Sequence, residues 1–70
     1  MARNSTYKLV EIVGTSDNSF AKAVASGVQR ASKSLRNLDW FEVTEMRGRI
    51  EKGKVAQYQV KIKVGFRLED

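Results

Sequence analysis

The sequence predicts an α+β fold, a small β-α-β-β subunit whose three-stranded antiparallel sheet wraps around one helix. Three observations support this. Segment 55–68 alternates strictly between apolar and polar residues, segment 17–36 carries apolar residues at helical spacing, and Lys52-Gly53 is a tight turn between two strand-like segments. Seventy residues suit one domain, so we expect a single domain over residues 1–70, with residues 1–5 as a loose end.

The first strand is expected at residues 6–13, where apolar residues are dense but alternate poorly. Gly14 is expected to end this strand. The polar residues 15–18 that follow are typical of a helix N-cap.

The helix is expected over residues 17–36. Its apolar stripe consists of Phe20, Val24, Val28, Ala31, Leu35 and Leu38. Gly27 lies inside this helix, where it costs about 1 kcal/mol relative to Ala, so a close approach of backbones is expected there. Asn37 tolerates the left-handed conformation and is expected to stop the helix.

The last two strands are expected at residues 39–50 and 55–68, joined by the Lys52-Gly53 turn. A helix between the first and second strands makes a crossover, so these two strands should be parallel and not directly joined. Placing the third strand between them gives the order 1-3-2, with every neighbouring pair antiparallel.

Trp40, the chain's only tryptophan, is expected on the sheet face opposite the helix, because Phe41 and Val43 have the other parity. The Lys52-Gly53 turn sets a register in which Trp40 faces Gly65 and Met46 faces Gln59. In that register Trp40 and Gln59 are six residues apart, roughly 20 Å along the sheet. Either a bulge and strong curvature shorten this distance, or one site combines residues of different subunits, which is the version we favour. An outward indole serves either as packing at a subunit interface or as a stacking platform for a flat ligand.

Composition limits the function classes. The net charge is +5, which fits a solvated surface, attraction of nucleic acid or attraction of small phosphorylated ligands. There is no Cys or His, so only carboxylates could hold a metal, and we expect none. So small a chain is marginal alone, which favours oligomerisation. No signal peptide or membrane span is visible, so we expect a cytoplasmic protein without a membrane partner.

Several segments together resemble the dodecin family over nearly the whole chain. They are Val10-Glu11-Ile12-Val13-Gly14-Thr15-Ser16, Leu38-Asp39-Trp40-Phe41-Glu42-Val43, Arg47-Gly48, Tyr58-Gln59-Val60 and Val64-Gly65-Phe66-Arg67-Leu68-Glu69. The resemblance implies a hollow homo-dodecamer of 23-type symmetry. It also implies flavin bound in pairs between tryptophans at subunit interfaces.

The same resemblance implies roles for single residues. Trp40 would stack on the flavin, Gln59 would contact its polar edge, and Asp39 would lie beside the site. Arg47 and Arg67 would serve phosphate-bearing ligands. Arg47 has the parity of Phe41, so it shares the Trp40 face only if a strand bulge lies between Val43 and Arg47, and without a bulge it reaches another neighbour. Coenzyme A is implied as a second ligand, with basic contacts at Arg30 and Arg36.

The function expected from these residues is storage and sequestration of FMN, riboflavin or FAD, and not catalysis, since no nucleophile–base pair is visible. A small basic nucleic-acid-binding module is the alternative, although Lys and Arg are interleaved with Glu over all elements. A flavin-dependent enzyme is a third hypothesis, which the lack of room for a substrate between two stacked rings argues against.

Overall fold

A computed structural model describes residues 4–69. Its elements are β1 (Tyr7–Ser16), α1 (Phe20–Ser32), β2 (Leu38–Glu51) and β3 (Lys54–Arg67). They form one sheet in the order β1-β3-β2, and both neighbouring pairs are antiparallel, as the sequence predicts. Of the expected loose end, residues 1–3 lie outside the described part, and residues 4 and 5 have no regular structure.

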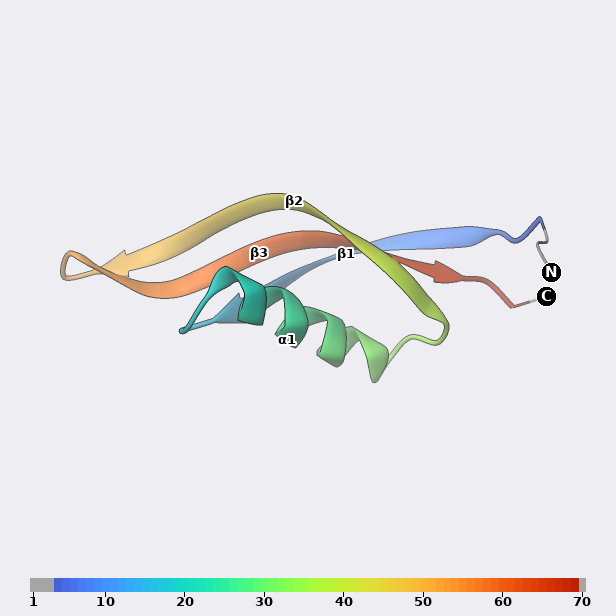
Figure 1. Cartoon of the computed structure of the whole chain (residues 1–70), viewed down its shortest axis with the longest axis horizontal. Helices are drawn as coiled ribbons and strands as arrows, with labels where there is room; N and C mark the ends of the chain where they lie inside the picture. Colours follow the sequence, from blue (N-terminus) through green and yellow to red (C-terminus); the bar gives the residue numbers. More distant parts are fainter. Residues whose placement is uncertain (1–3, 70) are drawn as a thin grey trace.

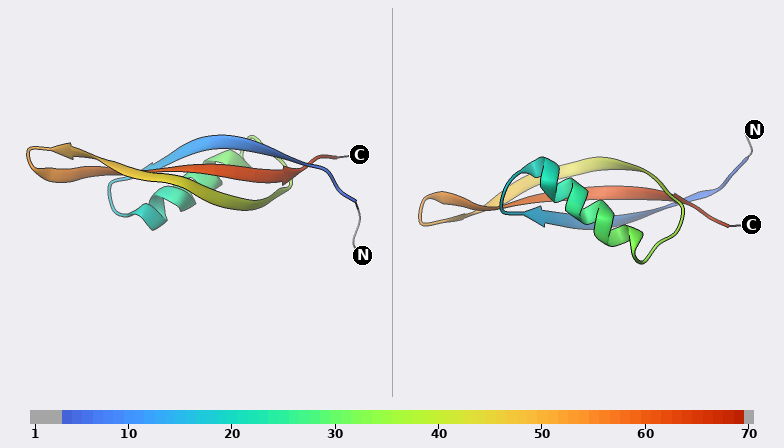
Figure 2. Two further views of the ribbon diagram at one scale, coloured as in Figure 1. Left: turned by 90° about the horizontal axis from the view of Figure 1, so that it is seen from above. Right: turned by 60° about the horizontal axis from the view of Figure 1, so that its bottom comes forward.

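Helix α1 lies across one face of the sheet and packs on β1 and β3 (Figures 1 and 2). The core lies at this contact. Val60, Ile62 and Val64 of β3 are fully buried against Ala23 of the helix. These three residues share one face of β3 because side chains two apart on a strand point the same way. The other face of the sheet carries Trp40.

Two glycines bring α1 against β1. The Cα of Gly14 lies so near the helix that a Cβ there would overlap the carbonyl oxygen of Ala23 and stand 3.2 Å from the Cα of Gly27. The close approach expected at Gly27 is therefore confirmed. The expectation that Gly14 ends the first strand is wrong. β1 continues to Ser16, since Gly14 remains paired with Val60 and serves packing instead of a turn.

Helix α1 is shorter than residues 17–36. Ser19 is its N-cap, with its hydroxyl accepting a hydrogen bond from the backbone N–H of Lys22 at 3.0 Å, and the helix ends at Ser32. Asn37 is left-handed (φ 63°), as expected, but it lies beyond the helix end. Its backbone and side-chain hydrogen bonds to Arg67, at 3.1 and 3.2 Å, hold the start of β2 beside the end of β3.

The register between β2 and β3 contains three bulges, and two of them offset each other. Glu51 pairs with Lys54 at the turn, as expected. A shift between Arg49 and Ile50 then moves the pairing by one residue, and a shift between Val43 and Glu45 restores it. Between the two shifts the prediction fails, because Met46 pairs with Val60 and not with Gln59. Beyond them it is confirmed, since Trp40 pairs with Gly65.

Much of the sheet is uncovered within one chain. On the helix side of β2, Phe41, Val43 and Met46 form what we call the β2 apolar strip, and they are 44–56% exposed. The strip stays open because α1 lies over β1 and β3. At least ten large apolar residues are exposed by 40% or more. This is an unusually large exposed apolar surface for a chain of 70 residues.

The β2–β3 hairpin extends beyond the other elements (Figure 1). β1 pairs with β3 only as far as Tyr58, so the segment from 49 to 57 is a two-stranded ribbon. The molecule is consequently elongated, 52 × 20 × 17 Å. Lys52 (φ 51°) and Gly53 (φ 75°) close the ribbon in the left-handed conformation that a two-residue hairpin turn requires.

Candidate functional site

Trp40 projects from the sheet face opposite the helix, as predicted. Its indole lies over the backbone of Gly65, and a Cβ there would stand 2.5 Å from the ring. Tyr7 of β1 flanks the indole, with ring centroids 5.2 Å apart and planes tilted by 60°. The backbone and Tyr7 thus fix the indole, while 42% of the residue stays exposed. This arrangement offers a flat ligand a fixed aromatic surface.

Arg67 belongs to the same end of the sheet. It pairs with Tyr7 across β1 and β3, and it follows Gly65 by two residues on β3, which puts it on the Trp40 face. The structure therefore brings Tyr7, Trp40, Gly65 and Arg67 together, and we call these four residues the aromatic end.

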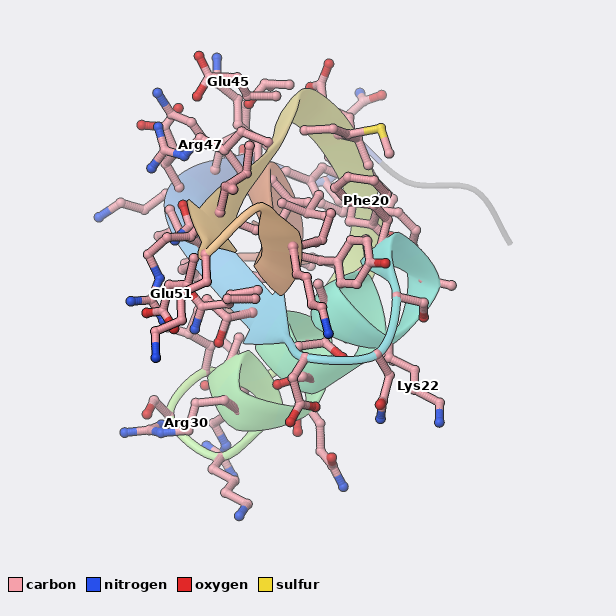
Figure 3. The ribbon with its side chains drawn as sticks, turned by 90° about the vertical axis from the view of Figure 1, so that its left-hand side faces the viewer. Phe20, Lys22, Arg30, Glu45, Arg47 and Glu51 are labelled. Carbon is pink, nitrogen blue, oxygen red and sulfur yellow. The ribbon has the colours of Figure 1, made fainter. Side chains whose placement is uncertain are left out.

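Gln59 and Arg47 form a second group on the same face. They are paired across β2 and β3, and the Nε of Arg47 donates a hydrogen bond to the Oε1 of Gln59 at 2.8 Å. Gln59 in turn donates from Nε2 to the Oε1 of Gln57 at 2.8 Å. Glu45 accepts from the Nη1 of Arg47 at 3.4 Å, on the side of the sheet away from α1 (Figure 3). We call these four residues the polar end.

The bulge between Val43 and Glu45 makes the polar end possible. Thr44 is the extra residue, and its hydroxyl donates to the carbonyl oxygen of Lys61 at 3.1 Å. Without the bulge, Arg47 would point to the helix side with Phe41. The extra residue reverses its direction, so the bulge that the sequence required for Arg47 is present.

The two ends are separate within one chain. Gly65 and Gln59 are six residues apart on β3, roughly 20 Å at strand spacing. A ring system of flavin size cannot touch Trp40 and Gln59 of the same chain. The aromatic end and the polar end therefore do not form one ligand site within a single chain.

The other predicted site residues lie elsewhere. Asp39 is the extra residue of the third bulge, between Leu38 and Trp40. It lines a small hollow of about 160 Å³, which Trp40 also lines. Arg30 lines an open groove of about 530 Å³ between α1 and β1, where its Nη1 donates to the hydroxyl of Ser34 at 2.9 Å. Arg36 lies 3.6 Å from the carboxylate of Glu69 and is largely exposed. Arg30 and Arg36 line different hollows.

The sequence did not indicate three of these neighbours. Tyr7 meets Trp40 only through the β1–β3 register, and β1 alternates too poorly to set that register in advance. Within the polar end, Glu45 lies two residues from Arg47 on β2, and Gln57 lies two residues from Gln59 on β3. The bulge at Thr44 puts Glu45 and Arg47 on the face that carries Gln59. A residue two positions from Gln59 on the same strand shares its face, which was the one available signal for Gln57.

No three acidic, His or Cys side chains among residues 4–69 gather closely enough to hold a metal ion. Within the same described range, no helix combines the length and the hydropathy of a membrane span.

The fold and these surfaces define a small α+β ligand-binding subunit with an open aromatic face. The family model described as Dodecin matches residues 6–69. The chain belongs to the dodecin family, a family of non-catalytic, oligomeric proteins that bind small ligands.

Individual relatives agree with this. The dodecin of Thermus thermophilus is 53% identical over 64 residues, which cover 91% of this chain and 93% of the relative. The structure of dodecin from Streptomyces coelicolor superposes with a TM-score of 0.95 at 55% identity and covers 99% of both chains. A more distant relative, the calcium dodecin of Mycobacterium tuberculosis, is 33% identical over 91% of this chain and 90% of its own. Its crystal structure, with a novel calcium-binding site, gives a TM-score of 0.81.

Proposed function

We propose that this protein binds and stores flavin in the cytoplasm, at the interfaces of a homo-dodecamer with 23-type symmetry. The observation that carries the proposal is the outward indole of Trp40, fixed over Gly65 and still 42% exposed. An isoalloxazine ring is flat, electron-poor and poorly soluble, so an indole surface suits it. The family to which the chain belongs supports the proposal, since its members bind small ligands.

The division of the site supports binding between subunits. Trp40 supplies stacking, and Gln59 supplies an amide that pairs with a ring edge carrying both N–H and C=O groups. Trp40 and Gln59 of one chain are too far apart to contact the same ring. Each site would therefore combine residues from different copies of the chain. The exposed β2 apolar strip supports assembly as well, because its burial between copies would add stability to a small core.

Phosphate-bearing flavins are the proposed ligands of the two arginines. Arg67 lies at the aromatic end and Arg47 at the polar end, and a guanidinium grips phosphate in a bidentate way. We propose FMN as one ligand beside riboflavin and FAD. Coenzyme A is a further proposed ligand, with Arg30 as its contact at the groove beside α1 and Arg36 at the loop that follows.

Storage without turnover is the proposed role. Two flavins stacked between two indoles leave little room for a substrate, and electron transfer from indole would quench the excited flavin. Both effects fit a protein that keeps flavin out of photochemical reactions.

Titration of the protein into riboflavin or FMN tests the proposal. We expect the flavin fluorescence to fall to a plateau as the protein is added. Native mass spectrometry of the same sample is expected to show twelve subunits with flavin mass attached. Unchanged fluorescence, or a monomer without flavin mass in the mass spectrum, would rule the proposal out.

A further inference from the structure

The polar end is a continuous chain of side-chain hydrogen bonds, and its order along the sheet is Glu45, Arg47, Gln59, Gln57. The contacts are Arg47 Nη1 to Glu45 Oε1 at 3.4 Å, Arg47 Nε to Gln59 Oε1 at 2.8 Å and Gln59 Nε2 to Gln57 Oε1 at 2.8 Å. Gln59 is therefore engaged at both of its amide atoms, although it lies on an open face.

These two contacts distinguish the ends of the Gln59 amide. Arg47 has no acceptor, so the atom it contacts must be the carbonyl oxygen. The amide nitrogen then points to Gln57, whose oxygen accepts. Rotating the Gln59 amide by half a turn would set an N–H against the guanidinium and lose the bond from Arg47. The bond to Gln57 would be kept only if the Gln57 amide turned as well. The pair Arg47 and Gln57 thus holds Gln59 in one of its two orientations.

The fixed amide still has bonding capacity. A glutamine oxygen has two lone pairs and its nitrogen has two N–H donors. The contacts to Arg47 and Gln57 use one of each, so one acceptor position and one donor position remain. These two positions, held in a fixed order, match a ring edge that presents one N–H and one C=O side by side.

We propose that Gln57 is a positioning residue that, together with Arg47, fixes the amide of Gln59 and thereby sets the selectivity of the site for the imide edge of the flavin ring. The inference rests on the proposed flavin binding and adds to it a residue that would act without touching the ligand. It also gives Arg47 a task that does not depend on phosphate.

The test compares riboflavin with riboflavin methylated at the imide nitrogen, which has lost the ring N–H. Dissociation constants for both ligands are measured by flavin fluorescence. The wild-type protein is expected to bind riboflavin about tenfold more tightly, because methylation leaves an amide position unpaired. In Gln57→Leu this preference is expected to fall to about twofold, since the Gln59 amide, then held by Arg47 alone, turns more easily to suit either ring.

Two variants control the comparison. Gln57→Glu keeps an oxygen that accepts from the Nε2 of Gln59, so it is expected to keep most of the preference. Gln29→Leu makes the same chemical change as Gln57→Leu on the exposed face of α1, where Gln29 makes no side-chain contact with the polar end, and is expected to leave the preference unchanged. Ligand-free crystal structures add a readout that needs no flavin. Gln59 should occupy one conformer in the wild type and several in Gln57→Leu.

The outcomes separate the two ideas. If the wild type binds neither ring, the flavin proposal fails and this inference falls with it. If the wild type binds riboflavin without discriminating against the methylated ring, only the inference is overturned. The same holds if Gln57→Leu discriminates as well as the wild type, or if Gln59 keeps one conformer in that variant.

Discussion

The indole of Trp40 lies against the backbone of Gly65, with no room for a side chain between them. A methyl group at position 65 would stand 2.5–2.6 Å from three carbons of the ring. The glycine thus lets the indole lie close to the sheet, where Tyr7 flanks it at 5.2 Å. The geometry of the proposed stacking surface therefore depends on a residue that has no side chain.

Gly65→Ala is expected to displace the indole without unfolding the protein. The clashing atoms belong to the outer part of an exposed side chain, which can swing away, so stability should change by no more than about 1 kcal/mol. Riboflavin affinity should fall at least about fivefold, because the ring loses its fixed position. Fluorescence titration and thermal melting measure the two effects.

The matched control is Gly53→Ala in the hairpin turn. Gly53 has φ 75° and open space around it, so alanine there costs about 1–2 kcal/mol of strain and should leave riboflavin affinity unchanged. Equal loss of affinity in both variants would show that general destabilisation, and not the indole position, is responsible.

Gly14→Ala is expected to destabilise the fold strongly. The new Cβ would overlap the carbonyl oxygen of Ala23, a backbone atom, so α1 must lift away from β1. We expect a loss of about 3 kcal/mol in the free energy of unfolding. Guanidinium unfolding at fixed subunit concentration measures it. Gly27→Ala is the comparison, because its Cβ would meet the Cα of Gly14 at 3.2 Å while helix propensity improves by about 1 kcal/mol. A milder effect at position 14 than at position 27 would contradict the packing argument.

Trp40→Ala is expected to weaken riboflavin binding more than Gln59→Ala does. Removal of the indole loses apolar burial and a stacking term of about 0.5–1.5 kcal/mol beyond it, whereas removal of the amide loses hydrogen bonds worth about 1 kcal/mol each. Trp40→Phe should lie between the wild type and Trp40→Ala. Dissociation constants from fluorescence titration decide the order, and a larger loss in Gln59→Ala would place the main binding energy at the polar end.

Arg67→Gln is expected to reduce the preference for FMN over riboflavin by about fivefold, since the guanidinium would contact the phosphate and has no such partner in riboflavin. The preference of the wild type should also fall as salt is raised. Arg49→Gln serves as the control, because Arg49 lies on the hairpin ribbon and is paired with Glu51 at 2.9 Å. A preference that is unchanged in Arg67→Gln would remove this residue from the phosphate contact.

The strand order and the partner of Trp40 could be predicted from the sequence, for a physical reason. The crossover helix and the tight Lys52-Gly53 turn allow few topologies, and the clean alternation of β3 indicates the central strand. The register at Trp40 came out right because two bulges of opposite sense offset each other. Between the bulges the same reasoning failed for Met46, because a bulge shifts the apolar alternation by one residue and the expected register included no such shift.

The ends of α1 and the length of β1 were harder to predict from the sequence. Leu35 and Leu38 continue the apolar stripe of α1, but Leu35 lies in the connection after Ser32 and Leu38 is the first residue of β2. Both are partly buried, which keeps them apolar without a helix. Glycine often ends a strand, so the sequence alone favoured a strand end at Gly14. The close contact of Gly14 with Ala23 and Gly27 of α1 explains why a glycine stands inside β1. The contact of Gln59 with Arg47 likewise depends on a pairing across β2 and β3 that only the folded register creates.

The order β1-β3-β2 has a consequence for synthesis of the chain. β3 is the last strand to leave the ribosome, yet it is the strand to which both others bond. A nascent chain that ends before residue 54 holds β1 and β2 without their common partner, and it also lacks Val60, Ile62 and Val64 for α1 to pack on. The chain can therefore fold only after β3 has been synthesised. Shorter chains that remain on a stalled ribosome should stay unfolded and be degraded by proteases.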